Sequence, residues 1–156
     1  MKNPYQRRVK DVMSKHVVTV DFGDSVQEAL SLMVENRVSG LPVVNRRQRC
    51  VGVLSATDLV DLAHDVDDEL SQMDQTSEVS SQWMMGQLAS HGMDRRKVEE
   101  LMSNMVASVG PETSLSETAQ TMLRHRVHRL PVLDEQRRVL GIISTMDILS
   151  AFVDGA

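Results

Sequence analysis

Apolar residues recur at helical spacing in the first third of the chain. Ser25 stands three residues before Glu28, and this pair is the signature of a capping box. In such a box the hydroxyl and the carboxylate satisfy the first free N–H groups of a helix. The pattern predicts a helix that starts at Ser25 and buries one face. The apolar positions of that face are Val26, Ala29, Leu30, Met33 and Val34.

Short apolar runs on both sides of this helix predict strands. "VVTV" (17–20) precedes the helix, and "LPVV" (41–44) and "CVGVLS" (50–55) follow it, with a polar turn over 45–48. Because proline has no N–H, we expect the strand with Pro42 at a sheet edge or just entering the sheet. A further helix is expected to start at Ser55-x-x-Asp58.

The same pattern returns in the last third of the chain. Residues 9–64 align with residues 98–153 without a gap, and the stretch "LPV" occurs in both copies. The constant register indicates an internal duplication. The second copy has the strands "VASV" (106–109) and "VLGIIS" (139–144), a box at Ser114-x-x-Glu117, and a helix face of Leu115, Ala119, Met122 and Leu123. Other identical pairs include Val9/Val98, Met13/Met102, Ser14/Ser103, Gly52/Gly141, Ser55/Ser144 and Asp58/Asp147.

Each copy therefore reads β-α-β-β-α, which predicts a mixed α/β (α+β) fold of two pseudo-symmetric repeats packed sheet to sheet. We expect a first repeat over 1–64 with its N-terminal segment, an acidic linker over 65–97, and a second repeat over 98–156. Residues 65–94 contain no Lys or Arg. A short helix is predicted over 81–91, and its Trp83 either docks on the chain's own core or contacts a second subunit or partner.

Bulk composition limits the classes of function. The chain has 156 residues with 41% apolar and 3% aromatic content, which allows an aliphatic core. The net charge of −5 argues against nucleic acid or an anionic membrane as the main partner. No apolar run approaches the roughly 18 residues of a membrane helix, and the N-terminus lacks a signal-peptide core. The one cysteine, Cys50, is expected to be a buried residue in a reducing compartment. We therefore expect a cytoplasmic protein.

The repeated Ser-x-x-Asp allows two interpretations. As a capping box, it only starts a helix, and its carboxylate complements the helix dipole. As a nucleotide site, the helix N-terminus would hold a phosphate and the Asp would accept the hydroxyls of a ribose. Gly52 and Gly141 stand three residues earlier and would let a ligand approach the backbone. Both interpretations stay open on the residues alone.

The tandem pattern resembles a pair of cystathionine-β-synthase (CBS) domains, called a Bateman module. The resemblance covers residues 9–64 and 98–153. It implies a regulatory module rather than an enzyme, with no required cofactor. It also implies two clefts between the repeats that bind AMP, ADP or ATP, or S-adenosylmethionine. A homodimer that signals through itself or an unknown protein target is expected.

The resemblance also assigns residues to the two clefts. In similar proteins the Asp binds ribose, a Ser or Thr lies near phosphate, and strand backbones hold adenine. One cleft would combine Val17, Val18, Thr19, Val38, Ser39 and Gly40 with Ser144, Met146 and Asp147. The other would combine Val106, Ala107, Ser108, Val127, His128 and Arg129 with Ser55, Thr57 and Asp58.

The two clefts are not expected to be equivalent. His128-Arg129 occupies the place of Ser39-Gly40, and in kinase γ-subunits of this type "VHRLPV" contacts phosphate. Arg129 offers a permanent forked donor, so we expect phosphorylated nucleotides to prefer the site that it reaches. The alternative is an exposed polar pair beside a strand.

Other motifs point to no further chemistry. The five histidines lack zinc-like spacing, and no phosphate loop, nucleophile elbow or acid–base pair is present. The basic runs at 7–8 and 95–97 are interpreted as solvated helix starts, with phosphate contact as the alternative. The rival to nucleotide sensing is a structural or protein-interaction module with vestigial clefts.

Overall fold

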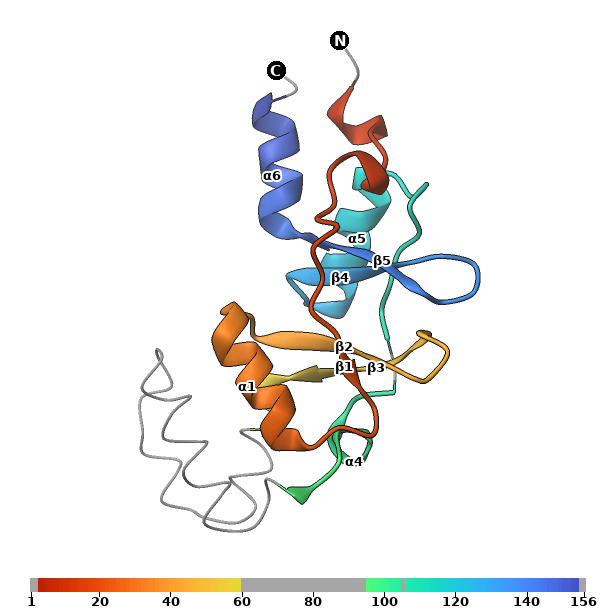
Figure 1. Cartoon of the computed structure of the whole chain (residues 1–156). Coiled ribbons are helices and arrows are strands. Elements are labelled where there is room, and N and C mark those ends of the chain that lie inside the picture. The colour runs from red at the N-terminus through yellow and green to blue at the C-terminus, as the bar shows by residue number, and fades with distance from the viewer. Residues whose placement is uncertain (1–2, 60–94, 105, 155–156) are drawn as a thin grey trace. The chain divides into compact units, whose positions relative to one another are not determined.

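The computed structural model describes residues 3–59, 95–104 and 106–154 (Figure 1). The predicted helix over 81–91 lies outside the described residues. The described helices are η1 (Pro4–Gln6), η2 (Val9–Asp11), α1 (Val26–Asn36), α4 (Val98–Leu101), α5 (Leu115–His125) and α6 (Thr145–Asp154). The strands are β1 (Val20–Asp21), β2 (Gly40–Val44), β3 (Cys50–Ser55), β4 (Arg129–Leu133) and β5 (Val139–Ser144). Residues 56–59 are also helical.

The chain forms two compact units. Among the described residues, the first-repeat unit holds 18–47, 51–59 and 95–104, and the second-repeat unit holds 3–17, 48–50 and 106–154. Each unit has its own buried aliphatic cluster between a sheet and its helices. The elements follow the predicted β-α-β-β-α order, so the mixed α+β fold class is confirmed.

The helices α1 and α5 begin where the sequence predicts. The hydroxyls of Ser25 and Ser114 accept hydrogen bonds at 3.2 Å from the N–H groups of Glu28 and Glu117. In α5, however, the prediction that Leu123 is buried is wrong, because its side chain is 79% exposed. Thr118 is fully buried instead. It can lie in an apolar core because its hydroxyl donates to the carbonyl of Ser114 at 2.8 Å.

The first strand of each repeat is shorter than predicted, and proline explains why. In the second repeat the pairing is a single bridge between Val109 and Val132. Val109 donates to the carbonyl of Pro131, and Leu133 donates to the carbonyl of Val109. The next bond of a parallel ladder would need an N–H on Pro131, which proline lacks. Residues 106–108 therefore stay unpaired with β4.

The first repeat follows the same rule. There β1 pairs with β2 through Val20↔Val43 and Asp21↔Val44, so the ladder starts one residue after Pro42. Residues 17–19 are outside the strand. Of the two predicted places for the proline-containing strand, the sheet edge is wrong for this sheet, because β2 lies between β1 and β3. The other, a proline just entering the sheet, agrees with a ladder to β1 that starts after Pro42.

The segment that leads into each repeat packs in the compact unit of the other repeat. We call residues 4–14 the N-terminal strap and residues 95–103 the linker strap. Val9 of the N-terminal strap is fully buried in the cluster of the second-repeat unit. Its duplicate Val98, in the linker strap, is fully buried in the cluster of the first-repeat unit. The repeat boundaries drawn from the sequence stay a prediction, but the compact units exchange these straps.

Backbone hydrogen bonds hold the straps in place. In the second-repeat unit, Ser14 and Ile142 exchange two bonds at 2.9 Å, which adds a bridge beside β5. In the first-repeat unit, Val53 and Ser103 exchange bonds at 3.0 and 2.9 Å beside β3. The straps thus satisfy the outer edges of the second hairpin strands.

The straps also supply acceptors to the starts of helices α1 and α5. The first N–H of α1, on Val26, donates to the carbonyl of Arg96 at 2.8 Å, and that of α5, on Leu115, donates to the carbonyl of Arg7 at 3.0 Å. Among the described residues, the carboxylates of Glu28 and Glu117 make no capping bond. The prediction that they do so is wrong for these two helices, and the strap carbonyls meet a different N–H, that of the residue after each capping serine.

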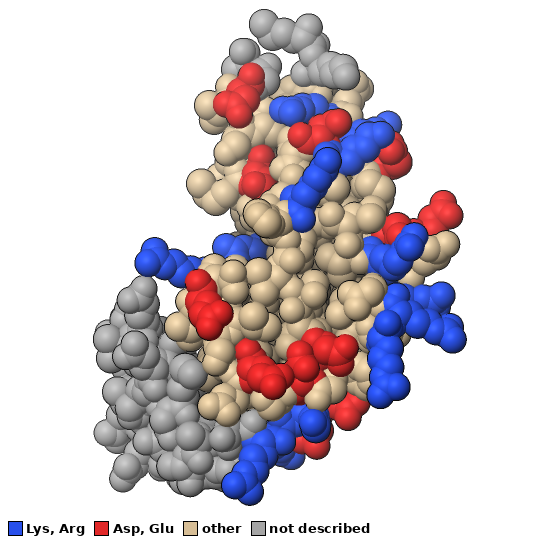
Figure 2. Space-filling view, in the orientation of Figure 1, with Lys and Arg blue, Asp and Glu red and all other residues tan. Residues whose placement is uncertain are grey.

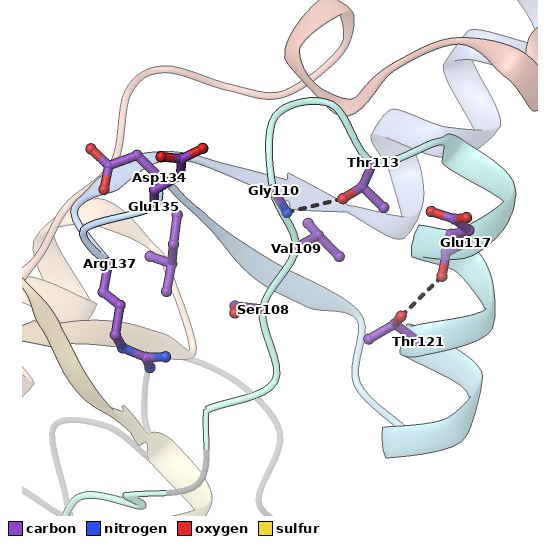
Figure 3. A pocket seen from close by; sticks show the side chains of 10 residues that line it. Ser108, Val109, Gly110, Thr113, Glu117, Thr121, Asp134, Glu135 and Arg137 are labelled. Carbon is purple, nitrogen blue, oxygen red and sulfur yellow. Dashed lines mark hydrogen bonds between the residues drawn. The ribbon is translucent and has the colours of Figure 1, made fainter.

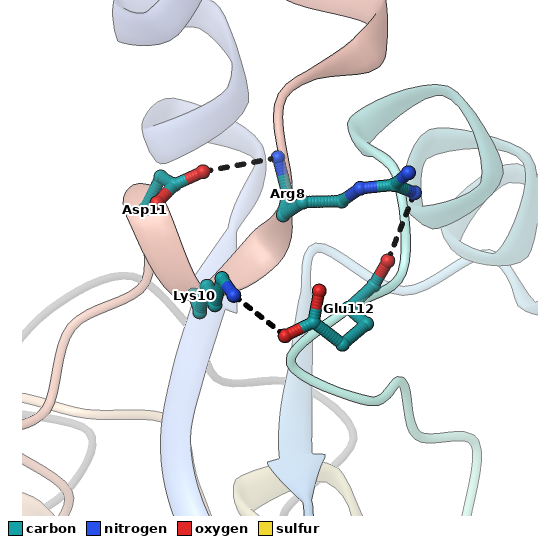
Figure 4. Close-up of polar contacts among 4 residues, drawn as sticks. All are labelled: Arg8, Lys10, Asp11 and Glu112. Carbon is teal, nitrogen blue, oxygen red and sulfur yellow. Dashed lines mark hydrogen bonds and ion pairs between the residues drawn. The ribbon is translucent and has the colours of Figure 1, made fainter.

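Side chains add a surface contact to the N-terminal strap (Figure 4). The Nζ of Lys10 lies 2.6 Å from the Oε1 of Glu112, and the guanidinium of Arg8 donates to the Glu112 carbonyl at 3.0 Å. The hydrogen bond to Glu112 raises the pKa of Lys10 above its usual value. The basic run at 7–8 therefore precedes a short helix, and its Arg8 also holds the N-terminal strap through the bond to the Glu112 carbonyl.

The straps explain Gly52 and Gly141. A Cβ on Gly141 would lie 2.7 Å from the carbonyl oxygen of Ser14, and a Cβ on Gly52 would lie 2.7 Å from that of Ser103. These positions lack a side chain because a strap crosses them. The expectation that the missing side chain admits a ligand is therefore replaced by a packing cause.

Candidate functional site

Each Ser-x-x-Asp joins the last strand of a repeat to the following helix. In the second repeat, Asp147 N–H donates to the Ser144 hydroxyl at 3.1 Å, and Ser144 N–H donates to Oδ2 of Asp147 at 2.9 Å. In the first repeat the corresponding distances between Ser55 and Asp58 are 3.2 and 2.9 Å. Both motifs are complete capping boxes, so the capping interpretation is confirmed. It does not exclude ligand binding, because it uses one oxygen of each carboxylate.

The start of the preceding strand lies beside each junction. The carbonyl of His128 accepts bonds from the N–H and the hydroxyl of Thr145 at 2.9 and 3.0 Å. Arg129, the first residue of β4, pairs with Ser144 in the ladder. In the first repeat the carbonyl of Ser39 accepts one bond, at 2.8 Å, from the N–H of Ala56.

Within each unit, the structure thus brings two groups of predicted residues together. The second-repeat unit combines Val127, His128 and Arg129 with Ser144, Met146 and Asp147. The first-repeat unit combines Val38, Ser39 and Gly40 with Ser55, Thr57 and Asp58. The predicted crosswise pairing of residues from different repeats stays a prediction.

The helix start leaves one N–H group open in each repeat. At the second junction, the N–H groups of Ser144, Thr145 and Asp147 have acceptors. Within the described part of the chain, the N–H of Met146 donates to no acceptor, and the same holds for Thr57 in the first repeat. Oδ1 of Asp58 and of Asp147 likewise accepts no bond from a described residue. A helix start with an open N–H and an available carboxylate oxygen can hold a polar ligand.

Residues before the short first strands are half-buried. This applies to Val17, Val18 and Thr19 and to Val106, Ala107 and Ser108. Among the described residues, these six form no ladder with the neighbouring strand, because proline ends the ladder there.

Ser108 also lines an open groove of about 440 Å³ in the second-repeat unit. Figure 3 shows Glu117 and Thr121 on one side of this groove, and Asp134, Glu135 and Arg137 on the other. The sequence did not indicate it, because Asp134 and Glu135 were interpreted as a turn. The hydrogen bond from the backbone N–H of Arg138 holds the pKa of Asp134 below its usual value. Three carboxylates against one guanidinium disfavour a phosphate, so we do not assign the groove to a nucleotide.

Other surface chemistry is sparse among the described residues. Lys and Arg are interspersed with Asp and Glu over the face shown in Figure 2. No cluster of His, Cys, Asp and Glu in the described ranges could hold a metal ion. Within those ranges, no helix has the length and apolarity to cross a membrane. Cys50 is 1% exposed, as expected for a small buried residue.

The CBS domain family matches the chain twice, at residues 9–65 and 98–154. The chain belongs to the CBS domain family. Its two matches are the two repeats, so the protein carries a CBS pair. CBS pairs are regulatory domains, and the strand–helix junctions described above recur once in each CBS repeat of this chain.

Known proteins of similar sequence and structure support this assignment. The CBS domain-containing protein YhcV of Bacillus subtilis is 31% identical over 140 residues, covering 90% of this chain and 81% of YhcV. The 5'-AMP-activated protein kinase subunit gamma-3 of Sus scrofa is 32% identical over 125 residues, covering 80% of this chain but 21% of the subunit. The crystal structure of CBSX2 in complex with AMP matches with a TM-score of 0.71 and 27% identity, covering 94% of this chain and 96% of CBSX2.

Enzymes also match, but over a small share of their length. The chain spans 23% of the inosine-5'-monophosphate dehydrogenase of Methanocaldococcus jannaschii, at 28% identity. The similarity to such enzymes is therefore confined to a part about the size of this chain.

Proposed function

We propose that this CBS pair is a regulatory module that binds an adenine nucleotide at its Ser-x-x-Asp junctions. The open helix-start N–H beside a carboxylate with an uncommitted oxygen, found at equivalent places in both repeats, carries the proposal. The N–H would meet a phosphate oxygen, and the carboxylate would accept two ribose hydroxyls. The AMP complex of CBSX2 and the similarity to a subunit of an AMP-activated kinase support an adenine nucleotide.

The two junctions carry different side chains, so they favour different groups of a nucleotide. Arg129 lies at the start of β4, where the first repeat has Gly40 at the start of β2. Thr57 offers a hydroxyl where the second repeat has Met146, whose side chain is 68% exposed. We propose that a nucleotide phosphate binds where Arg129 reaches, because a guanidinium holds phosphate through charge-assisted bonds.

Membership of the CBS domain family supports a wider regulatory role. A ligand shifts a regulatory module only if it binds two arrangements with different affinity. We propose a non-catalytic, cytoplasmic homodimer that passes the signal to a protein target, as the sequence led us to expect. S-adenosylmethionine is the alternative ligand.

A second candidate function has its own observation. Because both Ser-x-x-Asp motifs are complete capping boxes, they would be retained for stability in a purely structural or protein-interaction module. In that case the junctions would bind no nucleotide.

A thermal-shift panel separates the two functions. The panel contains AMP, ADP, ATP, adenosine and S-adenosylmethionine, with GMP as the matched control for the base. At a hundredfold excess over its dissociation constant, a ligand adds about 2.7 kcal/mol of stability. A shift with adenine compounds but not GMP supports the proposal, and no shift with any compound supports the structural module.

A further inference from the structure

The two repeats differ in how the start of the second strand is held. In the second repeat the carbonyl of His128 receives two bonds from Thr145, one from the N–H at 2.9 Å and one from the hydroxyl at 3.0 Å. In the first repeat, Ala56 stands in place of Thr145, and its N–H alone reaches the carbonyl of Ser39 at 2.8 Å. The hydroxyl bond is therefore an addition specific to the second repeat.

This bond is not the usual contact of a helical threonine. The hydroxyls of Thr118 and Thr121 donate to carbonyls four residues earlier in their own helix, at 2.8 and 2.9 Å. Such bonds stay within one helix and join it to no other element. The Thr145 hydroxyl instead reaches back 17 residues and joins the start of α6 to the start of β4.

The bond fixes a peptide plane that leads directly to Arg129. The carbonyl of His128 and the N–H of Arg129 belong to one rigid planar unit, so a second donor on the carbonyl restricts rotation of that plane. The direction in which the Arg129 side chain leaves the backbone follows from this plane. Arg129 is exposed and pairs with Ser144 in the ladder, which places its backbone beside the helix start.

We infer that Thr145 is a positioning residue for Arg129, and that its hydroxyl sets the phosphate selectivity of the second repeat. The inference rests on the proposed function, because it assigns Arg129 to a nucleotide phosphate. This role explains why the Thr145 hydroxyl is found in the second repeat, which also carries Arg129. In the first repeat, Gly40 has no side chain to orient, so the single bond from the N–H of Ala56 to the Ser39 carbonyl is enough.

Calorimetric titration of AMP and adenosine into three variants of the full chain tests the inference. Thr145→Val removes the hydroxyl and keeps the branched shape, Thr145→Ser keeps the hydroxyl, and Thr121→Val removes a hydroxyl bond of similar length from α5. Losing one orienting hydrogen bond is expected to weaken AMP binding to Thr145→Val about 2- to 10-fold. The affinity of Thr145→Val for adenosine, which has no phosphate, should change by less than about twofold. Thr145→Ser and Thr121→Val should bind AMP like the wild type.

A readout without ligand accompanies the titration. In an amide ¹H–¹⁵N spectrum, the Arg129 resonance should move in Thr145→Val and stay in place in Thr121→Val. Equal losses for AMP and adenosine, or an unmoved Arg129 resonance, would overturn the positioning role while leaving nucleotide binding intact. A wild-type chain that binds neither compound would refute the proposed function, and the inference with it.

Discussion

The substitution Gly141→Ala tests the exchange of straps most sharply. The added Cβ would stand 2.7 Å from the Ser14 carbonyl oxygen and 2.8 Å from the Sδ of Met13. Ordinary carbon–oxygen contacts lie at about 3.3 Å or more. The strap would have to move by roughly 0.6 Å, against a backbone oxygen that cannot rotate away.

The cost follows from what that movement breaks. The same Ser14 carbonyl accepts a bond from Ile142, and Ser14 donates a second bond back at 2.9 Å. Weakening two backbone hydrogen bonds costs about 1–3 kcal/mol, and overpacking costs a similar amount. We expect the free energy of unfolding to fall by about 2–6 kcal/mol.

Urea denaturation followed by far-ultraviolet circular dichroism measures this loss. Gly110→Ala is the matched control, because its Cβ would meet the Thr113 hydroxyl at an ordinary 3.6 Å. The free energy of unfolding of this control should stay within about 0.5 kcal/mol of the wild-type value. If Gly141→Ala were as stable as this control, the strap could not cross Gly141 as described.

Three further predictions concern the cores and the acid stability. Val9→Ala and Val98→Ala should each lower the free energy of unfolding by about 2 kcal/mol, since each removes two buried methyl groups. Leu123→Ala changes the exposed side of α5, so its free energy of unfolding in the same urea assay should stay within about 0.5 kcal/mol of the wild-type value. The pKa of Asp134 is lowered in the folded chain, so its stabilisation is present above its usual pKa of 3.8 and is lost as the pH falls through the lower folded value. Asp134→Asn should therefore lose less stability than the wild type in an acid titration from about pH 5 to pH 2, and equal losses would contradict the assignment.

Local signals in the sequence predicted the helices and the order of elements. Ser25 and Ser114 cap their helices, and the apolar spacing after them identified most of the buried face. The periodicity failed at Leu123, because an apolar residue at the border of a helix face is buried only if another element covers it. Thr118 was missed because its hydroxyl bonds within the helix and leaves a methyl group for the core.

Contacts between distant segments could not be predicted from such signals. The glycines at 52 and 141 were conspicuous as a duplicated pair, but a missing side chain does not reveal what lies next to it. The straps supply that contact from residues far away in the sequence. The identity of Val9 and Val98 contained the clue, since each is the first residue of a repeat and stands well ahead of that repeat's first strand.

The candidate site was predictable in its parts. The chemistry of Ser-x-x-Asp is local, and both junctions form as the sequence indicated. The second bond from Thr145 to His128 was not predicted, because it depends on the register of β4 and β5. The acidic groove beside Ser108 was missed because it lies between α5 and the turn at 134–137, and the local pattern of neither segment shows that they face each other.

The most direct test of nucleotide binding is a calorimetric titration of AMP into the wild type, Asp58→Asn and Asp147→Asn. Asparagine keeps an oxygen that can cap the helix but removes the charge that would hold the ribose. The account predicts that at least one variant binds AMP about 10- to 150-fold more weakly while unfolding at nearly the wild-type temperature. Unchanged AMP affinity in both variants would contradict it.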